Sequence, residues 1–371
     1  MTSMKPVFDN GVSKLFCADA RSLPLEDKSV HCIVTSPPYY GMRAYDVEPA
    51  PWDIETLPGQ LVPTEWCEHD WYDRTRKHPM ARSNYGSSYQ PQARGVNTME
   101  EPIRDRKCVR CGATWCKLGE EETSEEYIDH LIEVFVEAKR VLRDDGVMWV
   151  NLGDTYRNGS ALGIPWRFAL RMTEPPMNML LRSEVIWSKP NPFPENLQGW
   201  AWQDADEEGG EMQLSRGSWR CTEAHEPIFQ FAKAMHYYGE NPEANESTPN
   251  RRSVWDIPVY NAPNSHYAMF PEALLSSCIL SSTPSGGVCA KCGAPWARRM
   301  PNQWLRTCKC ETWGIEIGPT KATVLDPFCG GGTTVVVAQT LGRAGIGTDS
   351  SDKYLKDAVK RMEAVPFAMF S

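Results

Sequence analysis

Two short motifs, one near each end of the chain, contain the residues best suited to chemistry. Thr35-Ser-Pro-Pro-Tyr39 follows a hydrophobic run and combines a hydroxyl, two prolines that fix the backbone, and an aromatic ring. Asp326-Pro-Phe-Cys-Gly-Gly-Gly-Thr-Thr334 is typical of a strand that turns through glycines into a helix. Such glycines let the backbone approach a ligand, and the first helical amides are free to donate hydrogen bonds. The pair predicts a rigid platform for a planar base and a pocket for a nucleotide-like cofactor.

A second acid, one strand after the glycine-rich turn, narrows the kind of cofactor. Gly345-Ile-Gly-Thr-Asp349 places Asp349 at the end of the next strand, where a carboxylate can bind both hydroxyls of a ribose. Asp326 in the turn would repel a pyrophosphate, whereas the sulfonium and ammonium groups of S-adenosylmethionine are cationic. The residues therefore favour S-adenosylmethionine, and the alternative role for Asp349 is to cap the helix that follows.

The rest of the chain alternates between strand-like and helix-like patterns. Short runs rich in β-branched and aromatic residues predict buried strands at 15–18, 30–35, 147–152, 183–187, 227–232, 322–325 and 344–348. Apolar residues at helical spacing predict helices at 125–142, 165–172, 271–280, 333–341 and 353–362. Segments 191–217 and 240–251 lack a period and are predicted to be loops. This alternation indicates an α/β fold with a doubly wound, mostly parallel, Rossmann-like sheet.

The composition is that of a soluble globular protein. The 371 residues suffice for one large α/β domain with insertions or for two domains, and 41% are hydrophobic while 23% are charged. No apolar run reaches the roughly 18 residues that cross a bilayer. Residues 1–10 lack the apolar core of a signal peptide. We therefore expect a cytoplasmic location and no membrane partner.

Positive charge is concentrated in two segments, although the net charge of −9 is not typical of a nucleic-acid-binding protein. Residues 66–118 contain ten Lys and Arg against six Asp and Glu, and residues 286–311 contain five against one. Attraction to phosphate depends on the local field more than on the total charge. Two interpretations remain open for these segments, which are contact with DNA and plain solvated surface.

The thirteen cysteines predict metal sites and argue against a disulfide framework, because the chain shows no export signal. Eight of them lie in the two basic segments. In the second segment, Cys289-x2-Cys292 and Cys308-x-Cys310 provide four thiolates at the spacing of a structural zinc site.

The first basic segment contains a second pair, Cys108-x2-Cys111, followed by a glycine as in a zinc knuckle. Its expected partners are Cys67 and His69, and Cys116 is the competing ligand. Together the two segments predict two closed, structural Zn²⁺ sites.

The order of the two chemical motifs resembles that of the β-class amino-methyltransferases, the DNA N4-cytosine and N6-adenine methylases. In this class the catalytic motif comes first, and here Tyr39 precedes Asp326 by 287 residues. Further matches lie at Cys17–Asp19, Ser29–Val34, Arg140–Gly146, Trp149–Asp154, Ile186–Asn191, His225–Phe231 and His266–Leu274. The resemblance implies methyl transfer from S-adenosylmethionine to a base flipped out of double-stranded DNA.

The resemblance also implies which residues bind the cofactor. Those in the glycine-rich motif are Asp326, Phe328, Gly330, Gly332, Thr333 and Thr334, of which Phe328, Gly330, Gly332 and Thr333 would wrap the methionine part. Asp349 would hold the ribose, and Asp19 would lie near the adenine unless it only caps a turn. The segment 266–271, with His266, Phe270 and Pro271, would close the pocket.

The catalytic residues implied by the resemblance are Ser36, Pro37, Pro38 and Tyr39. An exocyclic amine reacts poorly because its lone pair is delocalised, so acceptors must bind its hydrogens and its nitrogen must be aligned with the methyl group. The prolines direct carbonyls into the pocket, and Tyr39 can stack on the flipped base. Ser36 at the first position favours cytosine N4, with adenine N6 as the alternative. None of the cysteines need act as a nucleophile.

Two zinc-ribbon-like insertions, at 48–118 and 284–321, interrupt the family pattern. We expect the catalytic core at 1–47 and 119–190, the target-recognition region at 191–260, the cofactor-covering segment at 261–283 and the cofactor-binding core at 322–371. The arginines expected to contact DNA phosphates are Arg104, Arg106, Arg110, Arg298 and Arg299, unless the insertions only stabilise the fold. Trp200, Trp202 and Trp219 are either wedges between bases or core residues.

Other interpretations of the whole chain remain open. A zinc-ribbon DNA-binding protein with an inactive methylase core is one, although the intact catalytic and glycine-rich motifs argue against it. An RNA substrate is less favoured, because the long region after Asn191 suits a duplex. A cognate restriction nuclease that acts on the same site without stable binding is a candidate partner, and the resemblance implies a prokaryotic or phage origin.

Overall fold

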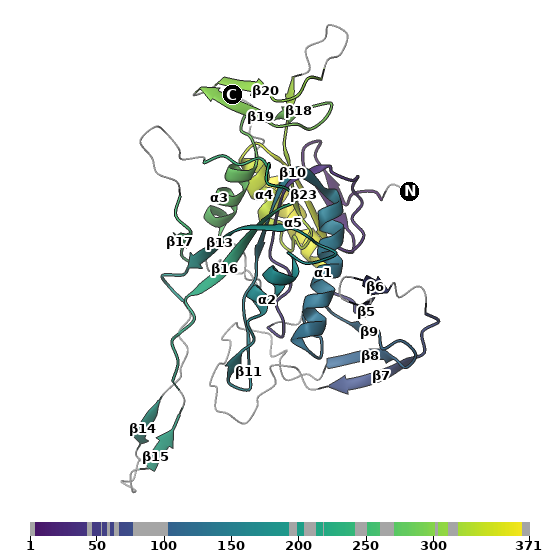
Figure 1. The fold of residues 1–371 in the computed structure, drawn as a ribbon, viewed down its shortest axis with the longest axis vertical. Coiled ribbons are helices and arrows are strands. Elements are labelled where there is room, and N and C mark those ends of the chain that lie inside the picture. Colours follow the sequence, from purple (N-terminus) through teal and green to yellow (C-terminus); the bar gives the residue numbers. More distant parts are fainter. Residues whose placement is uncertain are drawn as a thin grey trace.

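The computed structural model describes residues 4–42, 47–52, 54–57, 60–62, 67–76, 103–192, 199–203, 213–217, 219–241, 251–259, 271–300, 303–310 and 318–365. Within these ranges no helix combines the length and the apolar character needed to cross a bilayer. The described fold consists of a central sheet, helices on both of its faces and peripheral β elements (Figure 1).

Nine strands of the described residues form the central sheet. Their bounds are β1 Phe8–Asp9, β2 Lys14–Cys17, β3 Val30–Thr35, β10 Leu142–Asn151, β13 Leu180–Ser188, β16 His225–Ala232, β17 Val254–Asp256, β22 Thr323–Asp326 and β23 Ala344–Asp349. The spatial order is β1-β2-β23-β22-β3-β10-β16-β13-β17. β2, β23, β22, β3 and β10 run parallel, as do β13 and β17, whereas β1 and β16 are antiparallel to their neighbours. The predicted α/β fold with a mostly parallel sheet is confirmed.

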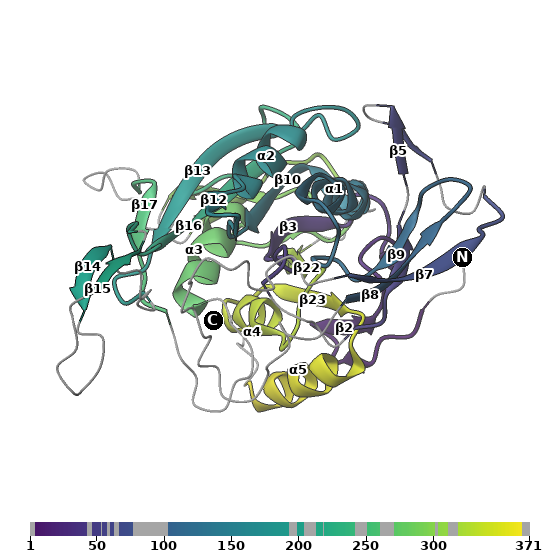
Figure 2. The same cartoon turned by 90° about the horizontal axis from the view of Figure 1, so that it is seen from below.

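Helices cover both faces of this sheet. α1 (Ser124–Val141) and α2 (Ile164–Arg171) lie on one side, and α3 (Glu272–Ser282), α4 (Thr333–Thr340) and α5 (Asp352–Ala364) lie on the other (Figure 2). Successive side chains of β3 point to the two layers, so Ile33 packs with α1 and α2 while Cys32 and Val34 pack with α3 and α4. Coverage of both faces explains why the core strands have continuous apolar sequences.

α1 begins one residue before its apolar period predicts, because Thr123 caps it. The Thr123 hydroxyl accepts a hydrogen bond from the Glu126 amide at 3.1 Å, and the Glu126 carboxylate accepts one from the Thr123 amide at 3.3 Å. This capping box satisfies two amides that the helix leaves unpaired. Leu131, Phe135 and Ala138 are fully buried along one face, which fixes the helix against the sheet.

Part of the segment predicted to be a loop forms a β-hairpin of β14 (Trp200–Gln203) and β15 (Gln213–Arg216). The loop prediction was wrong here. The two strands of the hairpin pair only with each other and project from the body of the molecule, so they do not need the apolar pattern of strands that cover a core (Figure 1). Trp200 is 69% exposed and therefore is not a core residue. β17 also lies within the range expected for target recognition, yet it forms an edge of the central sheet.

The first cysteine-rich insertion contains a four-stranded antiparallel sheet. Its strands, in spatial order, are β4 (Ala50–Trp52), β9 (Thr114–Cys116), β8 (Ile103–Cys108) and β7 (Trp71–Arg76), and β5 (Ile54–Leu57) pairs separately with β6 (Gln60–Val62). A short hairpin of β11 (Tyr156–Arg157) and β12 (Ser160–Ala161) follows β10.

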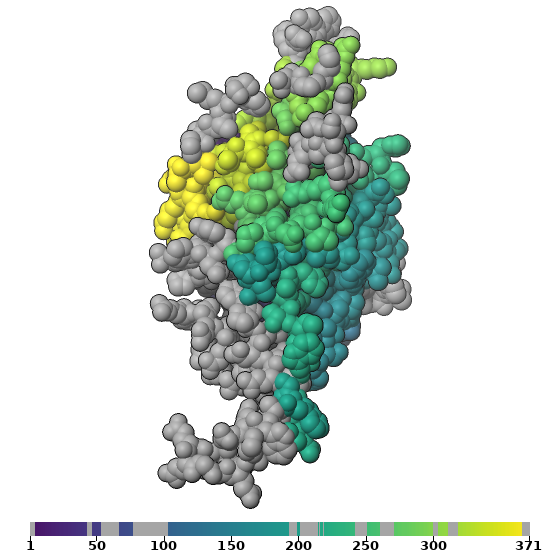
Figure 3. Space-filling view, turned by 90° about the vertical axis from the view of Figure 1, so that its left-hand side faces the viewer, coloured from purple at the N-terminus to yellow at the C-terminus, as the bar shows by residue number. Residues whose placement is uncertain are grey.

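The described part of the second insertion contains two strand pairs. β18 (Val288–Cys289) pairs with β21 (Pro319–Thr320), and β19 (Trp296–Met300) pairs with β20 (Gln303–Arg306). This insertion and the β14–β15 hairpin protrude from opposite ends of the molecule (Figure 3).

The second insertion is anchored at the amino-terminal ends of the core strands. His31, near the start of β3, donates from Nε2 to the carbonyl of Gly293 and accepts at Nδ1 from the Thr323 amide, both at 3.0 Å. Burial lowers the pKa of His31 to about 4, so the ring is neutral at pH 7 and keeps this tautomer. Arg143 donates to the carbonyl of Cys292 at 2.8 Å. Both chemical motifs lie at the other, carboxyl-terminal ends of the same strands.

Candidate active site

The strand order places the two motifs side by side at the carboxyl-terminal ends of the sheet strands. β3 and β22 are neighbours, with Ile33 paired to Leu325, so Thr35 and Asp326 end adjacent strands. Oδ1 of Asp326 accepts a hydrogen bond from the Thr35 hydroxyl at 2.7 Å, and Oδ2 accepts one from the Thr334 hydroxyl at 2.6 Å. One carboxylate therefore joins the strand before the catalytic loop to the helix after the glycine-rich turn.

This carboxyl group is removed from solvent. Asp326 is 4% exposed, and burial raises its pKa to about 6, while hydrogen bonds from Thr334, from Thr35 and from the Phe328 amide at 3.1 Å oppose the rise. Both oxygens are thus bonded to groups of the protein. Asp326 is placed to hold the two motifs in register.

The glycine-rich turn uses backbone conformations that side chains disfavour. Gly330 and Gly332 have φ angles of +48° and +76°, and a Cβ at Gly332 would lie 2.9 Å from the Cβ of Ala358. The turn therefore packs directly against α5. Its Gly330 amide donates to Oδ2 of Asp349 at 2.9 Å, which connects the turn to the neighbouring strand.

Asp349 ends β23 beside this turn. Its Oδ1 accepts from the Ser351 amide at 2.9 Å, and burial raises its pKa. The cap of α5 is Ser351, whose hydroxyl accepts from the Tyr354 amide at 3.4 Å. The helix-capping alternative for Asp349 is therefore wrong. Each carboxylate oxygen has one of these hydrogen bonds and can accept another from a ligand.

The other predicted cofactor residues are more dispersed. Asp19 follows β2, the strand beside β23, and its carboxylate accepts from the Arg21 amide at 2.8 Å and pairs with the Arg21 guanidinium at 2.6 Å. Asp19 thus caps this turn, and its position near the adenine stays a prediction. Pro271 is buried at the start of α3. His266 and Phe270 lie outside the described residues.

Arg361 of α5 also contacts the glycine-rich turn. Its Nη1 donates to the hydroxyl of Thr333 at 2.8 Å and to the carbonyl of Gly331 at 2.7 Å. Burial lowers the pKa of this guanidinium. No sequence pattern indicated this contact, because an arginine near the end of an amphipathic helix is usually solvated.

The catalytic loop is held against α1 and β10. The Tyr127 hydroxyl donates to the carbonyl of Pro38 at 2.7 Å. A Cβ at Gly153 would lie 2.6 Å from the Tyr39 ring, so this ring rests directly on the backbone after β10. Among the four predicted catalytic residues, Pro37 is buried. The other three are half-buried: Ser36, Pro38 and Tyr39.

Tyr39 belongs to a polar cluster that sequence reasoning missed. Its hydroxyl donates to Oε2 of Glu226 at 2.7 Å and accepts from the Ser36 hydroxyl at 3.2 Å. Asn151 Nδ2 donates to the same Glu226 oxygen at 2.7 Å, and Lys189 forms an ion pair with Oε1 of Glu226. We call Ser36, Tyr39, Asn151, Lys189 and Glu226 the tyrosine cluster.

Only the strand order brings the tyrosine cluster together. Asn151 ends β10, Glu226 lies in β16 and Lys189 directly follows β13, and these three strands are adjacent in the sheet. A polar residue at the end of an apolar strand was the one available signal, and it applied to Asn151. Nothing local distinguishes Glu226 or Lys189.

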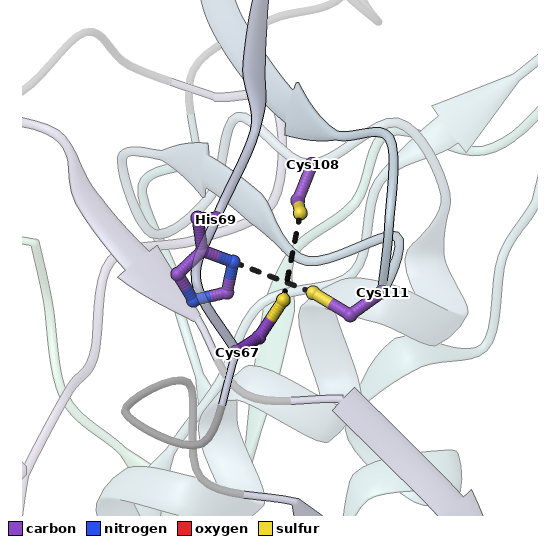
Figure 4. Close-up of side chains that lie close together, drawn as sticks. All are labelled: Cys67, His69, Cys108 and Cys111. Carbon is purple, nitrogen blue, oxygen red and sulfur yellow. Dashed lines mark hydrogen bonds between the residues drawn. The ribbon is translucent and has the colours of Figure 1, made fainter.

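Four side chains of the first insertion converge as predicted (Figure 4). Sγ of Cys67 lies 3.9 Å from Sγ of Cys108, and Sγ of Cys111 lies 3.4 Å from Nδ1 of His69. These separations suit four ligands at the corners of a tetrahedron around one ion.

In the second insertion four sulfur atoms lie within 4.8 Å of one another, those of Cys289, Cys292, Cys308 and Cys310. The residue expected to compete for the first set, Cys116, joins neither group. It lies with Glu121 and His130 instead.

Comparison with known proteins places this geometry in a family. The family model N6_N4_Mtase, described as DNA methylase, matches residues 30–360. The type II methyltransferase M.Cfr9I of Citrobacter freundii is 25% identical, with 97% of this chain and 90% of that protein covered. The type II methyltransferase M.SmaI of Serratia marcescens is 28% identical, with 66% and 77% covered.

A solved structure shares the fold. The PvuII DNA methyltransferase, which is cytosine-N4-specific, superposes with a TM-score of 0.55 at 15% identity and covers 96% of this chain and 88% of that chain. The family match includes both chemical motifs and the strands that carry the tyrosine cluster. The resemblance seen in the motifs is therefore confirmed, and this chain belongs to the DNA methylase family of N4 and N6 amino-methyltransferases.

Proposed function

We propose that this DNA methylase transfers the methyl group of S-adenosylmethionine to the exocyclic amine of a flipped base in double-stranded DNA, preferably N4 of cytosine. The observation that carries the proposal is the Asp326 carboxylate, which ties the catalytic loop to the glycine-rich turn through Thr35 and Thr334. A methyl donor at the turn and a base at Tyr39 would then meet at one edge of the sheet.

The residues around the turn suit S-adenosylmethionine. Phe328, Gly330, Gly332 and Thr333 would surround the methionine part, and the first amides of α4 can bind its carboxylate. Asp349, with acceptor capacity on both oxygens, would bind the ribose hydroxyls, and Asp19 would lie on the adenine side. Pro271, which precedes α3, would help to close the pocket. When bound, this cofactor supplies an electrophilic methyl group.

The tyrosine cluster supplies an oriented acceptor for the amine. Ser36 donates its only proton to the Tyr39 oxygen, and Tyr39 donates its own to Glu226. This row of hydrogen bonds leaves the Ser36 oxygen as an acceptor for an amine hydrogen and polarises it toward the carboxylate. Asn151 and Lys189 hold Glu226 in place. The backbone carbonyls fixed by Pro37 and Pro38 provide the other acceptors, and the Tyr39 ring stacks on the base.

Cytosine N4 is the preferred target because the first position of the catalytic motif is Ser36. Adenine N6 is the second candidate, since its amine has the same hydrogens and the same delocalised lone pair. Both reactions need the same acceptors and the same alignment with the methyl group. The choice between them depends on which base the pocket accepts.

The product identifies the base. Purified protein is incubated with unmethylated mixed-sequence DNA and methyl-labelled S-adenosylmethionine, and the digested nucleosides are analysed by mass spectrometry. We expect labelled N4-methylcytosine. Labelled N6-methyladenine would overturn the base assignment and leave the reaction type intact. Cofactor binding without any labelled nucleoside, on DNA of sufficient sequence diversity, would contradict the enzymatic function.

Two substitutions of Tyr39 separate its ring from its hydroxyl. Tyr39→Ala should reduce methyl transfer at least about 100-fold, because it removes a stacking platform worth about 1–3 kcal/mol as well as the hydrogen-bonded row. Tyr39→Phe keeps the ring and should lose about 10-fold. Cofactor affinity, measured by calorimetry, should stay within about twofold in both. Parallel losses of rate and cofactor affinity would contradict the stacking role.

Asp349 is tested by cofactor affinity. Asp349→Ala should weaken S-adenosylmethionine binding about 10-fold or more, because a hydrogen bond to a charged group contributes about 1.5–3 kcal/mol. Asp352→Ala is the matched control, since Asp352 lies three residues further along the chain, at the start of α5, and is exposed. Unchanged affinity in the Asp349 variant would exclude the ribose-binding role.

We also propose structural zinc in both insertions. The convergence of Cys67, His69, Cys108 and Cys111, and that of Cys289, Cys292, Cys308 and Cys310, supports one ion in each. Such ions would replace the hydrophobic core that small insertions lack. Metal analysis of the purified chain should find at least two zinc ions per chain, one for each insertion, and a complete absence of zinc would contradict the proposal.

A further inference from the structure

A third group of ligand-type side chains lies outside both insertion sites. Cys116 ends β9, Glu121 lies in the connection to α1, and His130 lies in the second turn of that helix. Their Sγ, carboxylate oxygen and ring nitrogen atoms lie within 4.8 Å of one another, and the residues are 1%, 1% and 4% exposed. Three different donor types therefore meet in the protein interior.

The buried carboxylate of this group needs a positive charge nearby. The side chain of Glu121 is 0% exposed, and in the described part of the chain the one basic side chain within ion-pair distance of it is His130, at 2.9 Å between Oε1 and Nδ1. A buried carboxylate is costly unless a positive charge compensates it. A divalent ion bound to one thiolate, one carboxylate and one neutral imidazole gives a site with no net charge.

The surrounding contacts orient the three donors. The amide of Gly119 donates to Oε2 of Glu121 at 2.8 Å, which leaves Oε1 toward His130. The His130 ring stacks on Trp52, with centroids 4.5 Å apart and an interplanar angle of 12°, and the Trp52 indole donates to the carbonyl of Cys116 at 2.9 Å. Partners of this kind fix the ligands of metal sites.

We propose that Cys116, Glu121 and His130 bind a third structural metal ion, with zinc as the ion best suited to mixed sulfur, nitrogen and oxygen donors. The burial of all three residues excludes a substrate from the site, so a water molecule would complete the coordination. The ion would join the last strand of the first insertion to α1 of the core.

The proposed site lies directly beneath the catalytic loop. The carbonyl of Gly119 accepts from the Gly41 amide at 2.8 Å, and a Cβ at Gly119 would lie 2.9 Å from the carbonyl oxygen of Tyr39. The Tyr40 hydroxyl donates to the carbonyl of Glu122 at 3.2 Å. An ion that fixes Glu121 would therefore also fix the segment on which the loop rests.

Native mass spectrometry of the full-length protein tests the proposal. After exposure to zinc and removal of the excess, the folded chain should retain three zinc ions. His130→Gln and Glu121→Gln should each retain two, whereas Cys278→Ser, which alters a buried cysteine of α3 outside the cluster, should retain three. A wild-type count of two would overturn this site and leave the two insertion sites intact. Three ions in the His130 and Glu121 variants would overturn it as well.

X-ray absorption at the zinc edge tests the wild-type protein without any variant. The two insertion sites alone predict a mean of about 3.5 sulfur ligands per zinc, because one is all-sulfur and the other has one histidine. Adding a site with a single sulfur lowers the mean to about 2.7. A mean near 3.5 would contradict the third site even if every variant failed to fold.

Discussion

The carboxylate of Asp326 is the group on which both halves of the site depend. It accepts hydrogen bonds from Thr35, which leads into the catalytic loop, and from Thr334, which lies in the first turn of the helix after the glycine-rich turn. Burial makes its ionised form costly, and that cost is offset only while these donors stay in place. The relative position of the two motifs therefore depends on hydrogen bonds that form only when both motifs are in place.

Polar groups collect at this edge because the carboxyl ends of the parallel strands meet there. The tyrosine cluster extends the same edge across β10, β16 and β13, so the reactive groups lie in a row along one side of the sheet. The second insertion is attached through His31 at the opposite, amino-terminal ends of the strands. Part of its positive charge is neutralised within the protein, because Arg298 forms an ion pair with Glu240 at 2.6 Å. The two insertions thus occupy different surroundings although their cysteine patterns are alike.

The sequence alone was sufficient for whatever depends on local pattern. The β3 strand, the glycine-rich turn and α4 follow from apolar runs and glycine spacing, and the ligand sets follow from cysteine spacing. It was insufficient for groups that only the tertiary structure brings together. Strand order does this for Glu226 and Lys189, and the packing of α5 on the turn does it for Arg361. The antiparallel direction of β16 has no local signature. Cys116 shows the same limit of sequence reasoning. Its short distance from Cys111 along the chain suggested a ligand of the first insertion, but it lies beside Glu121 and His130, which respectively precede and belong to helix α1.

The most direct test of the Asp326 link is the rate of a single methyl transfer in a Thr35→Val variant. Valine keeps the shape of this fully buried residue and removes its hydroxyl. The rate should fall about 10-fold or more at saturating cofactor, because a hydrogen bond to a buried charge contributes about 1.5–3 kcal/mol. Thr348→Val is the matched control, since it removes an equally buried hydroxyl whose one hydrogen bond among the described residues goes to the Pro327 carbonyl at 3.0 Å. A normal rate in Thr35→Val, or equal losses in both variants, would contradict the account.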